Sequence, residues 1–270
     1  MRRTAVLVVA LVLLAVSGAA PAGAQAATEF QPISDFDLIV DNTLDLSAKM
    51  LQANSPTTAI LVISDQLPSP VLLTPSTTSV QAVPLLRLVP QPSGRIRLLR
   101  GSELRSLGGF RVSAEGISFS YGDVMARLEQ RRPLVGEATM EELFEHSPDY
   151  RLTADQYRPD EDIVGLLRGV GEGYRVRVVY GSWCHVCKNF LPRGLKVQEA
   201  LGDTGIEFAY YGLPRNPWEP PHPEVARLDV RSLPTAIIYQ GDKEIGRYAG
   251  GDEWQRPESK LWAAIQKTKK

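Results

Sequence analysis

The sequence has few of the residues that build metal sites and structural disulfides: its 270 residues include two cysteines and three histidines. Both cysteines, Cys184 and Cys187, belong to one C-x-x-C pair. A structural zinc site usually needs a second pair, and none is present. The sequence also lacks a Gly-rich phosphate loop and a G-x-S-x-G motif, so nothing in it points to nucleotide binding or serine-hydrolase chemistry. We therefore expect no metal and no bound cofactor.

Long apolar runs are confined to the first residues of the chain. Arg2 and Arg3 precede an apolar stretch over 4–16, and small residues follow up to Ala26. This order is typical of a secretory signal peptide, so residues 1–26 are predicted to be cleaved. The protein is then expected to be periplasmic or secreted, touching the membrane only transiently through this peptide. The alternative is an uncleaved anchor with the protein facing the periplasm, although the apolar stretch is short for a membrane span.

No excess of positive charge is present. The formal net charge is −1, and loss of Arg2 and Arg3 with the signal peptide makes the chain more acidic. A nucleic-acid-binding surface normally requires a basic patch. We therefore expect no nucleic-acid partner.

The single cysteine pair is predicted to be chemically reactive. An exported protein with structural disulfides would carry more cysteines, and closing a C-x-x-C loop constrains little of the unfolded chain. The residues 174–180 read as a strand, and 188–201 read as a helix that stops at Gly202. A cysteine between a strand and a helix N-terminus is stabilised as a thiolate. Cys184 is thus the candidate nucleophile and Cys187 the thiol that resolves a mixed disulfide; a fixed local disulfide is the alternative.

Several motifs in order resemble the thioredoxin family over residues 150–267. Trp183 precedes the cysteine pair after a hydrophobic strand, as in that family. Further similarities are Pro192 inside the active-site helix, the segment 230–239 with Pro234 before a strand, the hairpin-like segment 241–248 and the glycines at 250–251.

Together with the signal-peptide pattern, this resemblance implies an α/β chain with three parts. Residues 1–26 form the signal peptide, 27–149 an N-terminal region of unknown function, and 150–270 a thioredoxin-like domain with a central mixed sheet flanked by helices. It also implies a redox-active disulfide between the two cysteines. The residues expected to contact substrate are Trp183, His185, Leu233 and Pro234, the last with a cis peptide bond. His185 has a second interpretation, as an exposed residue that tunes the motif.

One position departs from the family pattern. Thioredoxins bury an acidic residue six positions before the first cysteine, where this chain has Val178. Such a carboxylate accepts the proton of the resolving thiol. Glu172, Glu199 or Glu207 would replace it only if the fold brought one of them close.

The region 27–149 is predicted to be a small mixed α/β unit. Strands are expected at 59–63, 71–73 and 95–100, and a hairpin at 110–121. A strand with a short helix is expected over 37–50, and a second helix over 122–131. The capping-box pattern at Thr139 predicts a third helix through Glu145.

The sequence predicts an exported thiol–disulfide oxidoreductase, with the reductase direction preferred. Its partners would be protein thiols or disulfides and a redox protein that recycles the pair. The alternative function is a non-catalytic binding or assembly module of the cell envelope with a thioredoxin-like fold.

Overall fold

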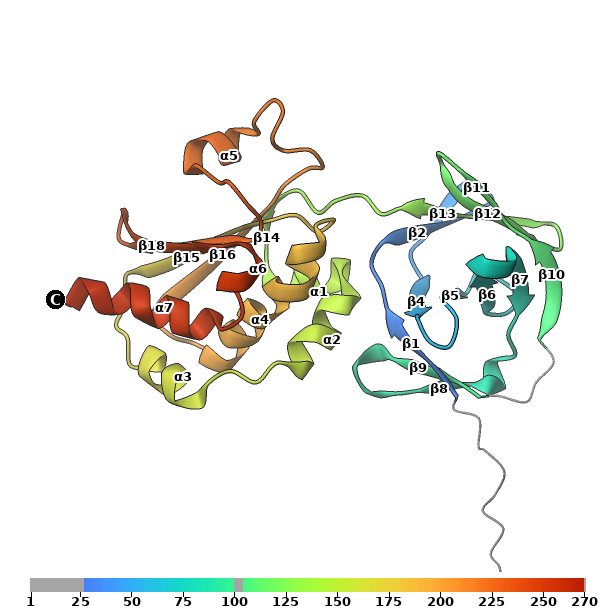
Figure 1. The fold of residues 1–270 in the computed structure, drawn as a ribbon, viewed down its shortest axis with the longest axis horizontal. Coiled ribbons are helices and arrows are strands. Elements are labelled where there is room, and N and C mark those ends of the chain that lie inside the picture. Colours follow the sequence, from blue (N-terminus) through green and yellow to red (C-terminus); the bar gives the residue numbers. More distant parts are fainter. Residues whose placement is uncertain (1–26, 100–103, 270) are drawn as a thin grey trace, which may run out of the picture.

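The computed structural model describes residues 27–99 and 104–269, so the predicted signal peptide lies outside the described residues. The chain forms an N-terminal unit of strands followed by a C-terminal unit with one sheet and all the described α-helices (Figure 1). The strands of the N-terminal unit are β1 (Thr28–Pro32), β2 (Phe36–Val40), β3 (Thr43–Asp45), β4 (Lys49–Ala53), β5 (Ala59–Ile63), β6 (Val71–Thr74), β7 (Ser79–Ala82), β8 (Leu88–Pro90), β9 (Ile96–Leu98), β10 (Arg105–Gly109), β11 (Arg111–Ser113), β12 (Gly116–Tyr121) and β13 (Val124–Gln130). The C-terminal unit contains β14 (Gly136–Ala138), α1 (Met140–His146), α2 (Pro148–Gln156), α3 (Glu161–Arg168), β15 (Tyr174–Tyr180), α4 (His185–Leu201), β16 (Ile206–Gly212), α5 (Pro223–Leu228), β17 (Thr235–Gln240), β18 (Lys243–Ala249), α6 (Gly250–Glu253) and α7 (Pro257–Gln266).

The N-terminal unit is built from two antiparallel sheets. One has the order β10-β7-β6-β5-β4-β1-β9-β8 and the other the order β11-β12-β13-β2-β3. Side chains alternate between the two faces of a strand. Ile60 and Val62 of β5 accordingly pack into the core shared by both sheets, while Leu61 packs into a second core with Phe30 and Leu98. Burial on both faces explains why β5 is a continuous apolar run.

The prediction of a mixed α/β unit over 27–149 was wrong for the part that precedes β14. Residues 27–99 and 104–130 form strands and short 3-10 turns, without an α-helix. The segment expected as a helix at 122–131 is β13, because Gly122 adopts a positive φ of 62° and closes a two-residue hairpin loop with β12. Ala126 and Leu128 are buried whereas Met125 is 54% exposed, which is a strand period.

A second hairpin replaces the short helix expected over 37–50. Asp41 and Asn42 have positive φ values of 46° and 66° and connect β2 to β3. Two consecutive residues of this kind form the tight turn that matches the twist of paired strands. By contrast, the predicted hairpin over 110–121 is confirmed as β11 and β12, and the predicted strands at 59–63 and 71–73 are β5 and β6.

The C-terminal sheet has the order β14-β16-β15-β17-β18. β15 runs parallel to β16 and antiparallel to β17, so the sheet is mixed. Figure 1 shows α2, α3, α4 and α7 on one face of this sheet and α5 on the other. Sequence reasoning began this domain at residue 150, yet β14 pairs with β16 and α1 packs against α2. The C-terminal unit therefore includes elements from residue 136 onward.

Side-chain caps fix where α1 and α3 begin. Thr139 and Glu142 exchange both capping-box hydrogen bonds, which confirms the predicted start of α1. Asp160 accepts from two backbone amides at the start of α3. α4 continues through Pro192 up to Leu201, and Gly202 follows it, as predicted.

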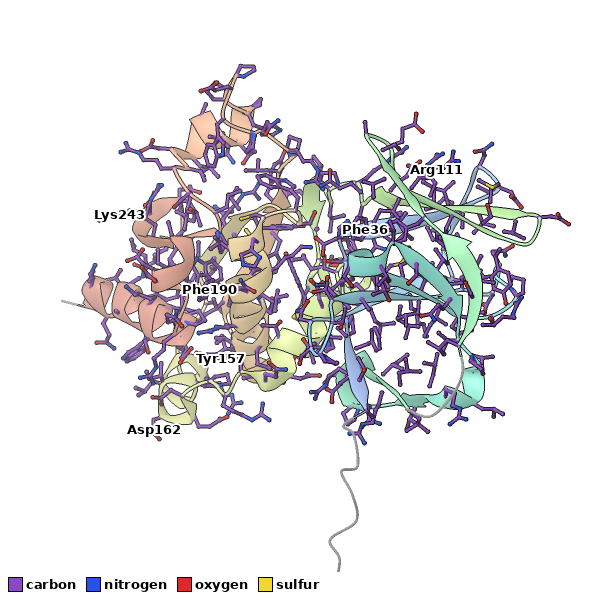
Figure 2. All side chains as sticks on the ribbon, turned by 45° about the vertical axis from the view of Figure 1, so that its right-hand side comes forward. Phe36, Arg111, Tyr157, Asp162, Phe190 and Lys243 are labelled. Atoms are coloured by element: carbon purple, nitrogen blue, oxygen red, sulfur yellow. The ribbon has the colours of Figure 1, made fainter. Side chains whose placement is uncertain are left out.

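The two units meet along the side of the N-terminal unit that carries β1 and β2. Figure 2 shows Phe36 on this side and Arg111 at the far end of the same unit. Polar contacts cross the junction: Ser34 donates to Asp149 at 2.7 Å, and Ser93 donates to Asp155 at 2.8 Å. Both acceptors are on α2, which packs against α4. The N-terminal unit is thereby attached to the helix pair that carries the cysteine motif.

No helix among the described residues combines the length and the apolar character needed to cross a membrane.

Candidate functional site

The cysteine pair lies where β15 passes into α4. The Cys184 amide donates to the Gly181 carbonyl at 2.9 Å, which turns the chain after the strand. Cys184 then occupies the N-cap position of α4, and its sulfur accepts from the Cys187 amide at 3.5 Å. An N-cap group receives the unpaired amides and the positive end of the helix dipole, both of which favour an anion.

The two thiols have opposite environments. Cys184 is partly exposed, whereas Cys187 is fully buried, and both are free thiols. A hydrogen bond from the Cys187 thiol, aided by the amides of Cys187 and Val186, lowers the pKa of Cys184 to about 6. Burial raises the pKa of Cys187 well above its usual value. The accessible sulfur is therefore the thiolate, and the buried one holds its proton.

Two tyrosines lie close enough to Cys187 to interact with it electrostatically. Burial raises the pKa of both Tyr150 and Tyr180, and a thiolate at Cys187 would raise each further. Neither hydroxyl has a hydrogen-bond partner among the described residues. Buried hydroxyls normally form hydrogen bonds. Within the part of the chain that the structure describes, these two are therefore unpaired polar groups in the surroundings of the resolving thiol. Sequence reasoning missed them because nothing in the local pattern distinguishes them from core tyrosines.

The carboxylates considered as replacements at Val178 have other surroundings. Glu199 forms ion pairs with Arg151 and with Lys196, the latter at 3.2 Å. Glu172 and Glu207 are exposed. Another carboxylate, Asp149, accepts from Ser34 and lies within electrostatic reach of Lys188, the residue that follows Cys187. Burial raises the pKa of Asp149, with Ser34 and Lys188 opposing that rise.

Trp183 forms one wall beside Cys184. Its ring nitrogen donates to the Leu213 carbonyl at 3.0 Å. A Cβ atom at Gly181 would approach the Trp183 ring to 2.8 Å, so a side chain at this position would displace the ring. The indole is thus held by a hydrogen bond on one side and by a close backbone approach on the other.

The strand register brings Pro234 to the same end of the sheet as the motif. Val179 pairs with Thr235 across β15 and β17, which places Pro234 level with Tyr180. The Leu233–Pro234 peptide bond is cis, and Leu233 is buried. The Pro234 carbonyl accepts from the Gly250 amide at 3.0 Å and from the Trp254 ring nitrogen at 3.1 Å. The loop that sequence reasoning assigned to substrate contact is therefore fixed to α6.

The first turn of α4 presents two polar side chains. His185 is exposed, and its Nε2 atom lies 3.0 Å from the side-chain nitrogen Nδ2 of Asn189. Its charge is the smallest of the causes that lower the pKa of Cys184. Lys188 extends to the N-terminal unit and pairs with Asp35 at 2.7 Å. Lys188 is thus a contact between the two units.

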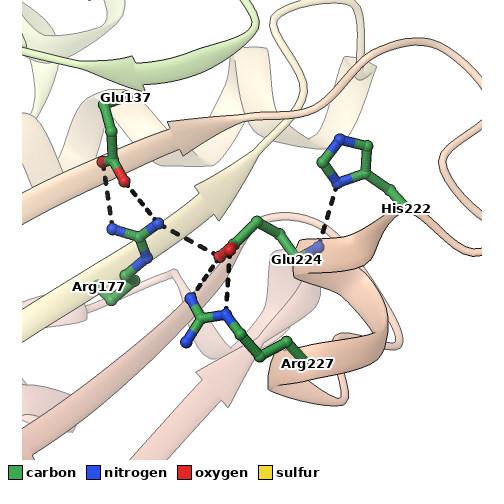
Figure 3. Close-up of polar contacts among 5 residues, drawn as sticks. All are labelled: Glu137, Arg177, His222, Glu224 and Arg227. Atoms are coloured by element: carbon green, nitrogen blue, oxygen red, sulfur yellow. Dashed lines mark hydrogen bonds and ion pairs between the residues drawn. The ribbon is translucent and has the colours of Figure 1, made fainter.

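A network of charged side chains holds the segment after β16 against the face of the sheet that carries α5. Figure 3 shows Arg177 between Glu137 of β14 and Glu224 of α5, with Arg227 on the far side of Glu224. Arg177 reaches Glu137 at 2.8 Å and Glu224 at 3.3 Å. His222 accepts from the Glu224 amide at 3.3 Å and caps α5. This network stabilises the loop opposite the helices and contributes no atom to the cysteine pair.

The two histidines outside the cysteine motif make other contacts. His222 caps α5, and His146 contacts the Arg132 carbonyl at 2.9 Å. Across the residues that the structure describes, no group of three or more His, Cys, Asp or Glu side chains is arranged to hold a metal ion.

Comparison with known proteins gives weak likenesses to several solved structures. No protein-family model matches the sequence, and no curated protein matches it. Among solved structures, a Pseudomonas aeruginosa protein of unknown function has a TM-score of 0.35 and 16% identity, over 48% of this chain and 86% of that one. Thioredoxin f2 of Chlamydomonas reinhardtii has a TM-score of 0.27 and 19% identity, over 41% and 93%. Spinach chloroplast thioredoxin f has a TM-score of 0.28 and 21% identity, over 42% of this chain and 84% of that one. At these scores the likenesses carry no argument about activity.

Proposed function

We propose that this chain is an exported thiol–disulfide oxidoreductase whose C-terminal unit is thioredoxin-like. The observation that carries the proposal is the asymmetry of the pair: a partly exposed Cys184 with its pKa lowered to about 6 beside a buried Cys187. The thiolate is the nucleophile in disulfide exchange, and a lowered pKa makes it available at neutral pH.

In the reductase direction, the Cys184 thiolate attacks a substrate disulfide. A Cys184–substrate bond forms, the substrate disulfide breaks, and the leaving sulfur departs as a thiolate. Cys187 then gives its proton to the released substrate thiolate and attacks the Cys184 sulfur, releasing the second substrate thiolate. Two electrons pass to the substrate, and the pair becomes a disulfide that a redox protein must reduce again.

The surroundings of the pair support a protein substrate. Trp183 and the Pro234 loop lie at the same sheet end as the motif, where an extended segment can lie across Cys184. We place the protein in the periplasm or outside the cell after loss of residues 1–26, or anchored by them and facing the periplasm.

Equilibration of the chain starting at residue 27 with glutathione buffers tests the proposal. A potential near about −270 mV supports the reductase direction, and one near about −120 mV reverses it. Cys187→Ser should accumulate a mixed disulfide with substrate proteins, and Cys184→Ser should not. A pair that fails to exchange with glutathione contradicts the proposal.

A second candidate is a non-catalytic envelope binding or assembly module. It is favoured by one observation: the N-terminal unit has two sheets and two cores of its own, and the cysteine pair lies in the C-terminal unit. This candidate predicts that Cys184→Ser leaves the cellular phenotype unchanged.

A further inference from the structure

A small polar cavity lies at the junction of the two units, directly beside the cysteine motif. The N-terminal unit and the segment after it contribute Ser34, Asp35 and Arg131, and the C-terminal unit contributes Trp183, Lys188 and Arg215. Its volume is about 40 Å³, more than the ~10–15 Å³ that one water needs. Because Trp183 and Lys188, which flank the two cysteines in the sequence, both line the cavity, a group bound here lies beside the cysteine motif.

The cavity has more positive than negative charge. Three cations line it, Arg131, Lys188 and Arg215, against one carboxylate, Asp35. His146 also lines it, and burial lowers the pKa of that imidazole, which keeps it neutral at pH 7. The cavity therefore favours an anionic group.

The carboxylates already present show how the cations pair. Lys188 pairs with Asp35 at 2.7 Å, and Arg131 pairs with Asp37 at 2.6 Å. Arg215 is exposed, and it donates to the Arg131 carbonyl at 3.3 Å. Within the described part of the chain, Arg215 forms no ion pair. It is the cation of the cavity that remains available to a further carboxylate.

We propose that this cavity binds an Asp or Glu side chain of the substrate protein, close in sequence to the cysteine that reacts with Cys184. The inference rests on the proposed function for the identity of the partner, while carboxylate binding itself requires no disulfide exchange. Guanidinium groups bind carboxylates through paired hydrogen bonds, and charge complementarity at the rim of an interface selects partners more than it adds affinity. Substrates with an acidic residue near the reactive cysteine are thus preferred over neutral ones.

Binding of redox-inactive peptides tests the proposal separately from the chemistry. Short peptides carry Ser in place of the cysteine and Glu at successive positions on either side, with Gln at the same positions as the neutral comparison. Calorimetric titration of the chain starting at residue 27 should show tighter binding of at least one Glu peptide, by about threefold to fivefold, as expected for an exposed ion pair. The preference should disappear in about 1 M salt, where exposed charges are screened.

Arg215→Gln should abolish the preference for Glu without changing the binding of the Gln peptides. Arg158→Gln is the matched control, since Arg158 is also exposed and also donates to backbone carbonyls, those of Asp155 and Tyr157. That variant should keep the preference. Equal binding of every Glu and Gln pair, or a preference that survives in Arg215→Gln, overturns the proposal. A cysteine pair that exchanges with glutathione under either result leaves the proposed function intact, so the two failures are distinguishable.

Discussion

Cys184 and Cys187 are three positions apart, and the helix start makes them chemically different. The thiol of Cys187 is the largest cause of the lowered pKa of Cys184, ahead of the two backbone amides and of His185. Burial, and after it the same hydrogen bond, raises the pKa of Cys187. At neutral pH the proton therefore stays on Cys187, and Cys184 is the thiolate. Cys184 accordingly attacks first, and Cys187 attacks in the second exchange step.

This residue-scale difference predicts a pH profile for alkylation. Iodoacetamide reacts with the thiolate, so Cys184 should be alkylated with a midpoint near pH 6 instead of near its usual value of 9.0. Cys187→Ala removes the largest cause and should move the midpoint clearly upward. His185→Ala removes the smallest and should move it much less. A larger shift in His185→Ala than in Cys187→Ala would show that the imidazole, and not the Cys187 thiol, controls the pKa of the nucleophile.

At the scale of elements, two helix glycines predict opposite stability effects. Gly165 in α3 is exposed, and a Cβ there meets nothing within 4 Å, so Gly165→Ala should stabilise the protein by about 0.5–1 kcal/mol. Gly194 in α4 faces Trp254, where a Cβ would lie 2.7 Å from the ring. Trp254 is 1% exposed, and its ring nitrogen donates a hydrogen bond to the Pro234 carbonyl, so the ring has little room to move. Gly194→Ala should cost about 1–3 kcal/mol.

Urea unfolding midpoints measure both changes. The two substitutions are chemically identical, which makes each the control for the other. If both variants were stabilised, Trp254 would have to yield without cost, and the close packing of α4 on α6 would not constrain the site.

The elements also show what a single sequence can predict. Capping at Thr139 and the buried runs of β5 and β15 were predictable because each depends on neighbours within a few residues. The segment at 122–131 was not, since Val124 and Leu128 fit a helix face as well as a strand, and the pairing of β13 with β12 and β2 decides between them. The Lys188–Asp35 contact joins residues 153 positions apart, and no local pattern signals it. The position of the cysteine pair between a strand and a helix was therefore predictable, while the contacts that the N-terminal unit makes beside it were not.

At the scale of the whole molecule, the junction depends on groups that titrate. His146 ends α1 and contacts the Arg132 carbonyl and the Ser147 hydroxyl, both at 2.9 Å. Arg131 of the same connecting segment donates to the His146 carbonyl at 2.7 Å and pairs with Asp37. This small set of bonds links β13 of one unit to α1 of the other, so a charge placed on His146 acts on the attachment of the two units.

Acidification should consequently weaken the junction. Burial, with Arg131 adding to it, lowers the pKa of His146 below 6.5, while the Arg132 carbonyl, Asp37 and Asp149 oppose the shift. The unfolded chain then binds this proton more readily than the folded one. Stability is therefore complete above pH 6.5 and falls as the pH drops from there through the pKa of His146 in the folded protein.

The variant His146→Gln keeps a side chain able to hydrogen-bond but cannot take up the proton. The thermal midpoint of the wild type should fall more than that of His146→Gln between pH 7 and pH 5, and limited proteolysis within 131–135 should increase over the same range in the wild type alone. Parallel pH profiles for the two proteins would mean that His146 does not govern how the N-terminal unit is held against the cysteine site.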